Sequence, residues 1–188
     1  MFSRTVSRSL PLVILLTALF GALPATASGA SFGPVTLAVP EGFVATPPQR
    51  QDNLAVWAWT KSAPGGTVKA LLQVNVYDFG SQFANVPRDE LGRGAEKYLR
   101  EFLSGVEHRR SDYVLSPVTR LELAGTPAAV ATWTGRAGPA VLVGTMYCVI
   151  VRNRFVISFH TQDLGTKPTS AMREAIAAIE AVQLTGVR

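Results

Sequence analysis

The sequence predicts one α+β domain, in which a twisted antiparallel sheet of about six or seven strands is flanked by helices as an α/β/α sandwich. Three observations predict this fold. Short segments alternate apolar and polar residues, as strands do, and two longer segments repeat their apolar residues at helical spacing. The connections between neighbouring strands are of hairpin length, which makes the strands largely antiparallel. Two apolar helix faces then need a surface, and one sheet supplies it.

The composition limits what this domain can do. The chain has 188 residues, 47% of them hydrophobic and 16% charged, which suffices for one packed core and is too apolar for disorder. One cysteine and two histidines exclude a disulfide framework and a multi-cysteine metal site, so we expect neither a metal nor a cofactor. The formal net charge is +5 for the whole chain and about +3 without residues 1–27, which is mild, and we expect no binding to nucleic acid.

The N-terminal segment 1–27 has the pattern of a secretory signal peptide. Two arginines precede an apolar stretch, and Ala25 and Ala27 fill the small-residue positions before a cleavage site. The apolar stretch is shorter than the roughly 20 residues that span a bilayer. No paired arginines precede it, which favours the general secretory route. We expect cleavage after Ala27 and an exported domain over residues 28–188, in the periplasm or outside the cell.

No other segment is long enough to cross a membrane, so we expect no membrane span after cleavage. An uncleaved segment 1–27 that tethers the domain is the alternative. A single domain follows the signal segment, because the sequence has no internal repeat and no linker.

The strands are expected in order after a short mobile lead at 28–34. Pro117 demotes the strand that contains it to an edge or bulged position. In the third strand, alternation places four apolar side chains on a dry face, and Gln73, Asn75 and Tyr77 on a wetter one. The expected strands are Val35–Val39, Leu54–Thr60, Val68–Phe79, Tyr113–Leu123, Ala128–Thr134, Ala140–Val151 and Phe155–Thr161.

Two helices are expected. The first runs from Pro87 to Val106 with Asn85 as its cap, and its apolar face includes Phe102. Burial of that ring predicts a loss of roughly 3–5 kcal/mol for Phe102→Ala. The second helix runs from about Pro168 to Gln183, and its inner face carries Met172, Ile176 and Ile179.

The layout resembles the PsbP/Mog-like superfamily, especially its bacterial exported DcrB-like branch. Val35–Val39 runs into Pro40-Glu41-Gly42-Phe43 as that family's first strand runs into a Pro-x-Gly-aromatic corner. Leu121–Ala128 resembles its strand–Gly-x-Pro–strand hairpin, and Phe155–Thr161 followed by a helix resembles its closing element. The resemblance implies an α/β/α sandwich that serves as an assembly or binding accessory, and it implies no activity.

One set of residues has the composition of a hydrolase site. Ser158 and His160 share a strand face by alternation, and Asp163 follows closely. No Gly-x-Ser-x-Gly elbow accompanies them, so a hydrogen-bonded pair on the sheet is the structural alternative. Cys148 lies in an apolar run and is expected to be a buried structural thiol.

Two other sets are candidates for binding. Trp57 and Trp59 alternate on one strand and, with Tyr77 and Trp133, either lie under a helix or form an aromatic contact surface. The stretch His108–Arg110 is either the solvated end of the first helix or a patch for an anion or acidic partner.

The first hypothesis for function is an exported, non-enzymatic accessory domain that binds a protein or small ligand in the cell envelope. Trp57, Trp59 and Tyr77 are its candidate contact residues. The alternative is an exported serine-type hydrolase that uses Ser158, His160 and Asp163.

Overall fold

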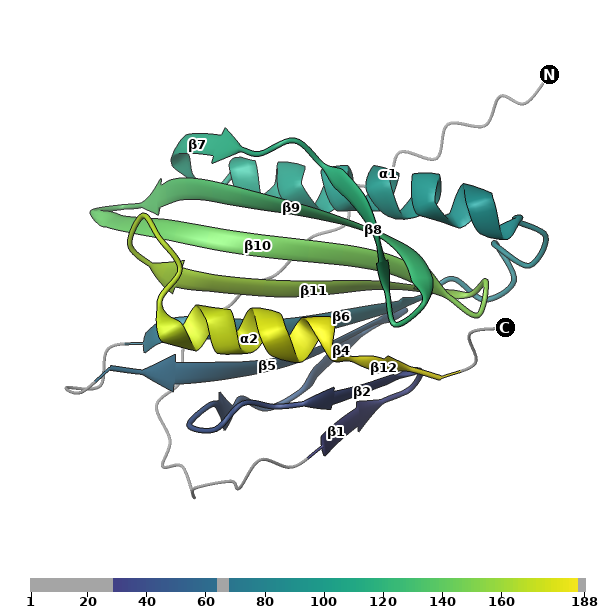
Figure 1. Ribbon diagram of the computed structural model, residues 1–188, viewed down its shortest axis with the longest axis horizontal. Coiled ribbons are helices and arrows are strands. Elements are labelled where there is room, and N and C mark those ends of the chain that lie inside the picture. The colour runs from purple at the N-terminus through teal and green to yellow at the C-terminus, as the bar shows by residue number, and fades with distance from the viewer. Residues whose placement is uncertain (1–28, 64–67, 186–188) are drawn as a thin grey trace.

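The computed structural model describes residues 29–63 and 68–185 (Figure 1). The predicted signal segment 1–27 and the turn predicted at 64–66 lie outside these ranges. Within them, no helix is both long and apolar enough to cross a membrane. The helices are α1 (Arg88–Glu107) and α2 (Ser170–Glu180). The strands are β1 (Gly29–Phe32), β2 (Val35–Ala38), β3 (Val44–Ala45), β4 (Gln49–Gln51), β5 (Leu54–Ser62), β6 (Val68–Asp78), β7 (Ser111–Leu115), β8 (Thr119–Leu123), β9 (Thr126–Ala137), β10 (Ala140–Val151), β11 (Phe155–Leu164) and β12 (Gln183–Leu184).

Nine strands form one sheet along the path β3–β5–β6–β11–β10–β9–β7, with β4 also paired to β5 and β8 also paired to β9. All of its pairs are antiparallel, as predicted. The sheet is larger than the six or seven strands expected, because both of its edges carry two short strands. α1 covers one face, and α2 covers the other together with a small sheet of order β1–β2–β12 (Figure 1).

The small sheet corrects the expectation of a mobile lead at 28–34. β1 pairs antiparallel with β2 through a two-residue turn, in which Gly33 supplies a φ of +59°. Phe32, at the end of β1, is buried and packs on Trp57 and Trp59 with ring centroids 4.7 and 5.4 Å apart. This aromatic contact fixes a segment whose other residues are small, which is why alternation alone does not reveal the strand.

β6 is buried on both of its faces, which corrects the expected wetter face. Gln73, Asn75 and Tyr77 are 6%, 3% and 2% exposed. The strand lies in the interior of the sheet, between β5 and β11, and its alternate side chains belong to the core clusters on the two faces of the sheet. The large sheet therefore contains polar side chains inside its α1-facing layer, and these are described below.

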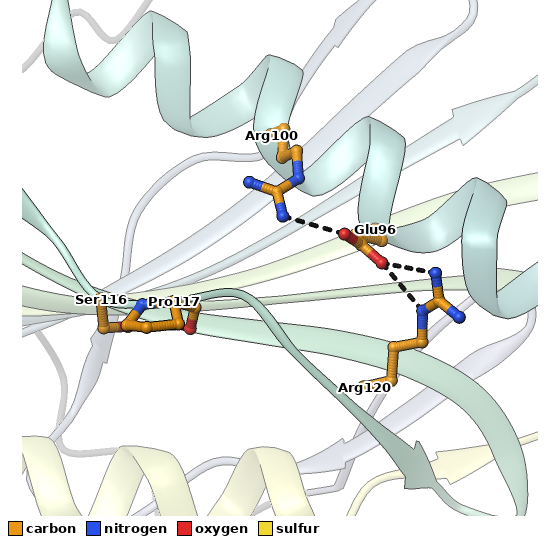
Figure 2. Close-up of polar contacts among 5 residues, drawn as sticks. All are labelled: Glu96, Arg100, Ser116, Pro117 and Arg120. Atoms are coloured by element: carbon orange, nitrogen blue, oxygen red, sulfur yellow. Dashed lines mark hydrogen bonds and ion pairs between the residues drawn. The ribbon is translucent and has the colours of Figure 1, made fainter.

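Pro117 breaks the strand predicted at Tyr113–Leu123 into β7 and β8, and both strands pair with β9. The Ser116 hydroxyl bridges the break, because its Oγ accepts a hydrogen bond from the Thr132 amide at 2.9 Å. Figure 2 shows how this edge is fastened to α1. The Glu96 carboxylate accepts hydrogen bonds from Arg100 at 2.9 Å and from Arg120 at 2.8 Å, which ties the helix to β8.

α1 begins after Pro87 and has no side-chain cap, so the expected cap at Asn85 is wrong. Its buried stripe passes through Leu91, Ala95, Leu99, Leu103 and Val106. Phe102 lies beside that stripe and is half-buried, stacked on Tyr77 with ring centroids 5.2 Å apart. The loss expected for emptying a fully buried aromatic site therefore does not apply to Phe102.

α2 is shorter than predicted and ends at Glu180, after which the chain turns into β12. Met172 and Ile179 are fully buried, as predicted, whereas Ile176 is half-buried. The helix ends early because Gln183 and Leu184 pair with β2 and complete the small sheet.

Candidate functional site

The two predicted tryptophans on β5 share a face, and that face packs against the small sheet rather than under a helix. Trp59 is 6% exposed and belongs to the core, so it offers no surface to a partner. Trp57 is half-buried beside the same core cluster, and the guanidinium of Arg50 lies 5.9 Å from its ring centroid. Of the pair, only Trp57 reaches the surface.

Tyr77 does not join the tryptophans. It points to the opposite face of the sheet, where it packs in the core cluster under α1. Burial raises the pKa of its hydroxyl to about 12. Trp133 also lies on that face and is 1% exposed. The aromatic set considered in the sequence is therefore divided between two cores, and no single surface contains it.

The α1-facing side of the sheet contains a row of buried polar side chains, which we call the polar row: Gln73, Asn75 and Ser158. Gln73 Nε2 donates to Asn75 Oδ1 at 2.7 Å, and Asn75 Nδ2 donates to Ser158 Oγ at 2.9 Å. Gln73 pairs in register with His160, and Asn75 with Ser158. Ser158 and His160 thus share a face, as alternation predicted, and both are almost fully buried.

Asp163 does not complete a catalytic triad. It follows His160 by three positions on β11, and an odd separation places two side chains on opposite faces of a strand. Its carboxylate instead accepts hydrogen bonds from the Leu164 amide and from the amide and hydroxyl of Thr169, at the start of α2. Because Asp163 cannot reach His160, no carboxylate among the described residues orients that imidazole.

His160 is 3% exposed, and its Nε2 has no hydrogen-bond partner among the described residues. Burial, together with the nearby charge of Arg110, lowers the pKa of the imidazole to about 4. The ring is therefore neutral near neutral pH. A hydrolase would need this nitrogen against the serine hydroxyl, whereas Ser158 Oγ is engaged with Asn75.

Trp133 lies flat on the sheet next to His160, with ring centroids 5.8 Å apart. Glycine on the neighbouring strand makes this possible. A Cβ built at Gly144 would lie 2.3 Å from indole Cε2, so no other residue fits beneath the ring. Gly135, two residues further along β9, likewise lies under Arg110. A Cβ built at Gly135 would lie 3.0 Å from the Cβ of Arg110.

Two further side chains surround the indole from the start of β7. Tyr113 stacks on it with ring centroids 6.1 Å apart, and the Arg110 guanidinium carbon lies 5.7 Å from its centroid. We call Arg110, Tyr113, Trp133 and His160 the indole cluster. Each of these residues has a buried polar side-chain atom without a hydrogen-bond partner among the described residues. The atoms are Arg110 Nε, Tyr113 Oη, Trp133 Nε1 and His160 Nε2.

The sequence indicated His160 and Trp133 as separate candidates, and it did not predict that they lie beside Arg110 and Tyr113. The available signal was the pair of glycines at 135 and 144, inside two strands that otherwise carry side chains for packing. Glycine in a strand interior indicates close approach by another group. The partners of that approach become visible only when β7 is placed beside β9.

The other predicted features are structural. Cys148 is fully buried, and burial raises the pKa of its thiol, as expected for an inert core cysteine. Within the described ranges, no three histidine, cysteine or acidic side chains gather where a metal ion could bind. An open pocket of about 500 Å³ is lined by Pro40, Glu41, Gly42, Lys61 and Glu174.

Lys61 lines that pocket, and its amine makes two hydrogen bonds there. Its Nζ donates to the Glu41 carbonyl at 3.0 Å and to Glu174 Oε2 at 2.8 Å, and it lies 5.6 Å from the Phe43 ring centroid. These contacts fasten the corner after β2 to α2. The pocket therefore marks a structural junction at the Pro-x-Gly-aromatic corner.

Comparisons with known proteins identify the fold. No family model and no curated protein sequence matches the chain. The Ran-binding protein Mog1p of Saccharomyces cerevisiae is similar in structure, with a TM-score of 0.51 at 9% identity over 81% of this chain and 90% of Mog1p. A substituted form of Mog1 gives 0.52 at 11% identity over 88% and 96%.

LpqN, a Mycobacterium tuberculosis protein involved in cell envelope biogenesis, gives a TM-score of 0.43 at 14% identity over 87% of this chain and 85% of LpqN. The likeness to Mog1 spans most of the chain. The chain therefore has a Mog1-like fold, which agrees with the fold that the resemblance implied, and the DcrB-like branch is not confirmed.

Proposed function

We propose that this chain is an exported accessory domain of the cell envelope, without enzymatic activity, that binds a protein partner beside Trp57. One observation carries the proposal: a half-buried tryptophan lies at the margin of the sheet with an arginine across its ring. Residues 44–53, which contain that arginine, are all exposed. Tryptophan and arginine are the residues most enriched among those that dominate binding energy at interfaces.

The chemistry of Arg50 selects the kind of partner. Among the described residues it forms no ion pair, and its guanidinium is held over the Trp57 ring. A partner that sets an acidic side chain against Arg50 and an apolar one against Trp57 would satisfy both groups. We therefore propose a protein with an acidic and apolar contact segment, rather than a nucleic acid.

The absence of a working triad supports the non-enzymatic part of the proposal. His160 and Asp163 lie on opposite faces of β11, and Ser158 is engaged with Asn75. Nucleophilic catalysis needs the serine, the base and the orienting group in one hydrogen-bonded line. Mog1p, which shares the fold, is a Ran-binding protein, so the fold is compatible with protein binding.

Export is tested by the mass of the protein. When the full chain is expressed with an intact secretory pathway, mass spectrometry of the envelope or secreted fraction should find a polypeptide that begins at Ser28, because Ala25 and Ala27 satisfy the cleavage pattern. A polypeptide that retains residues 1–27 would contradict cleavage and support a tethered domain.

Partner binding is tested by photo-crosslinking in cells. A photoreactive amino acid replaces Ala45, an exposed residue of β3 opposite Trp59, in the full chain. We expect a discrete crosslinked protein whose yield falls at least about tenfold when Trp57→Ala is added, since hot-spot aromatics contribute about 2 kcal/mol or more. Trp57→Phe should retain part of the yield, because it keeps an aromatic ring.

The matched control places the same photoreactive residue at Ala137, which is exposed at the far end of β9. This position should give no such product, and His160→Ala should not change the product formed from position 45. Circular dichroism checks that each variant is folded. A yield from position 45 that is insensitive to Trp57→Ala, or no product at all, would refute binding at this surface.

A further inference from the structure

The indole cluster concentrates unsatisfied polar groups in a way that the rest of the described protein does not. Six buried side-chain polar atoms lack a hydrogen-bond partner among the described residues, and four of them belong to this cluster. Buried polar groups are normally paired, because leaving one unpaired costs about 1–3 kcal/mol. Three of the four groups surround the indole and the fourth belongs to it, and each unpaired buried polar group calls for an explanation.

Each of the four groups can donate a hydrogen bond. The arginine Nε and the indole Nε1 can only donate, the tyrosine hydroxyl can donate, and a neutral imidazole can carry its proton on Nε2. The indole contacts all three of its neighbours, with centre-to-centre separations between 5.7 and 6.1 Å. The four unpaired atoms therefore belong to side chains that all contact one ring or form part of it.

The charge at this position is positive. Partial burial lowers the pKa of the Arg110 guanidinium, and the charge of Arg109 lowers it further. No ion pair of the described residues involves Arg110, and its guanidinium makes one described hydrogen bond, which it donates from Nη1 to the Arg109 carbonyl at 2.9 Å. Burial raises the pKa of the Tyr113 hydroxyl to about 12, and the charge of Glu107 adds to the rise. An anion would compensate the desolvated guanidinium.

The cluster also has an outer and an inner side. Arg110 and Tyr113 are half-buried, so parts of both side chains face solvent at the start of β7. Trp133 and His160 are almost fully buried and form the floor. The glycines beneath the indole and the arginine bring both side chains close to the sheet. Access is therefore from the β7 side, on the face opposite Trp57.

We propose that the indole cluster is a binding site for a small oxyanion, either a carboxylate or a phosphate, whose oxygens accept hydrogen bonds from the four unpaired donors. The site is separate from the proposed protein-binding surface, because the two lie on opposite faces of the large sheet. It gives a specific form to the anion patch that the stretch His108–Arg110 suggested in the sequence.

The test is a titration of the folded chain with sodium acetate and, separately, sodium phosphate, at fixed pH and at ionic strength held constant with chloride. The chain has two histidines, so imidazole ¹⁵N resonances report on the site directly. We expect a saturable shift of the His160 Nε2 resonance with one of the two anions, while the exposed His108 does not follow it. The anion that saturates identifies the class, carboxylate or phosphate.

Variants separate recognition from general charge. Arg110→Gln should weaken binding at least about tenfold, because it removes a charge-assisted hydrogen bond, and Tyr113→Phe should weaken it less while preserving the stacked ring. Arg93→Gln is the matched control, since it removes the same charge from an exposed site on α1 and should leave the affinity unchanged.

Three outcomes would overturn the proposal: no saturation with either anion, an equal response when chloride alone is varied, or the same affinity in Tyr113→Phe and Arg110→Gln as in the unsubstituted chain. Trp57→Ala should leave this titration unchanged. A failure of the photo-crosslinking experiment therefore does not affect this result, and the reverse is also true.

Discussion

Trp133→Ala is expected to lower the free energy of unfolding by about 3–5 kcal/mol, the range for removing a large buried aromatic side chain. The ring is 1% exposed and contacts Tyr113 and His160, so its loss leaves a cavity lined by side chains that cannot all collapse into it. Urea denaturation followed by circular dichroism measures the change. Trp57→Ala is the matched control and should cost less, because that ring is half-buried.

The same ring makes Gly144 sensitive to a single added carbon. A Cβ there would lie 2.3 Å from the indole, so Gly144→Ala should cost about 1–3 kcal/mol as an overpacked site. In the Trp133→Ala background, the penalty should largely disappear, because the atoms that clash are gone. A double-mutant cycle measures this coupling. Additive losses would show that the indole does not lie on Gly144.

The stability of the protein is expected to fall between about pH 6.5 and pH 4 because His160 is buried as a neutral ring. Its pKa is about 4 in the folded chain and about 6.5 when unfolded. In this window the unfolded state binds the proton and the folded state does not, so acidification favours unfolding. The contribution of His160 to the free energy of unfolding is therefore about 3 kcal/mol. It is fully present above pH 6.5 and is lost by about pH 4.

His160→Gln isolates this effect, because glutamine keeps polar atoms at the site without titrating. The free energy of unfolding of this variant, measured in urea at a series of pH values, should be flatter than that of the unsubstituted chain between pH 6.5 and pH 4. Asp78 and Glu96 also have lowered pKa values, owing to hydrogen bonds from arginines. The stabilisation that these two carboxylates contribute is lost in both proteins as the pH falls further. Parallel curves would exclude a buried neutral His160.

The arrangement of the elements was largely predictable because it depends on local patterns. Apolar alternation predicted β5, β6, β10 and β11 within a few residues. Pro117 indicated an edge or bulged strand, and the structure has two short edge strands, β7 and β8, on either side of it. The hairpin between β10 and β11 was also predicted, and Arg152 and Asn153 there adopt φ values of +55° and +47°. The small strands at the edges were missed, since two to four residues carry no detectable period.

The candidate sites were less predictable because they depend on which side chains the tertiary structure packs against one another. Alternation correctly placed Ser158 beside His160 and paired Trp57 with Trp59, yet it could not tell an exposed ring from one covered by Phe32. It also left Asp163 as a triad member, although counting three positions along a strand already places it on the opposite face.

The sequence by itself determined the class of the fold and the order of its main elements, because periodicity and turn residues are local properties of the chain. Only the tertiary structure decided that Trp57 reaches the surface while Trp59 and Tyr77 do not. It alone brought Arg110 and Tyr113 onto the indole of Trp133, since the pairing of β7 with β9 joins segments distant in sequence. Such contacts arise from the packing of whole elements, and the residues that form them carry no mutual signal along the chain.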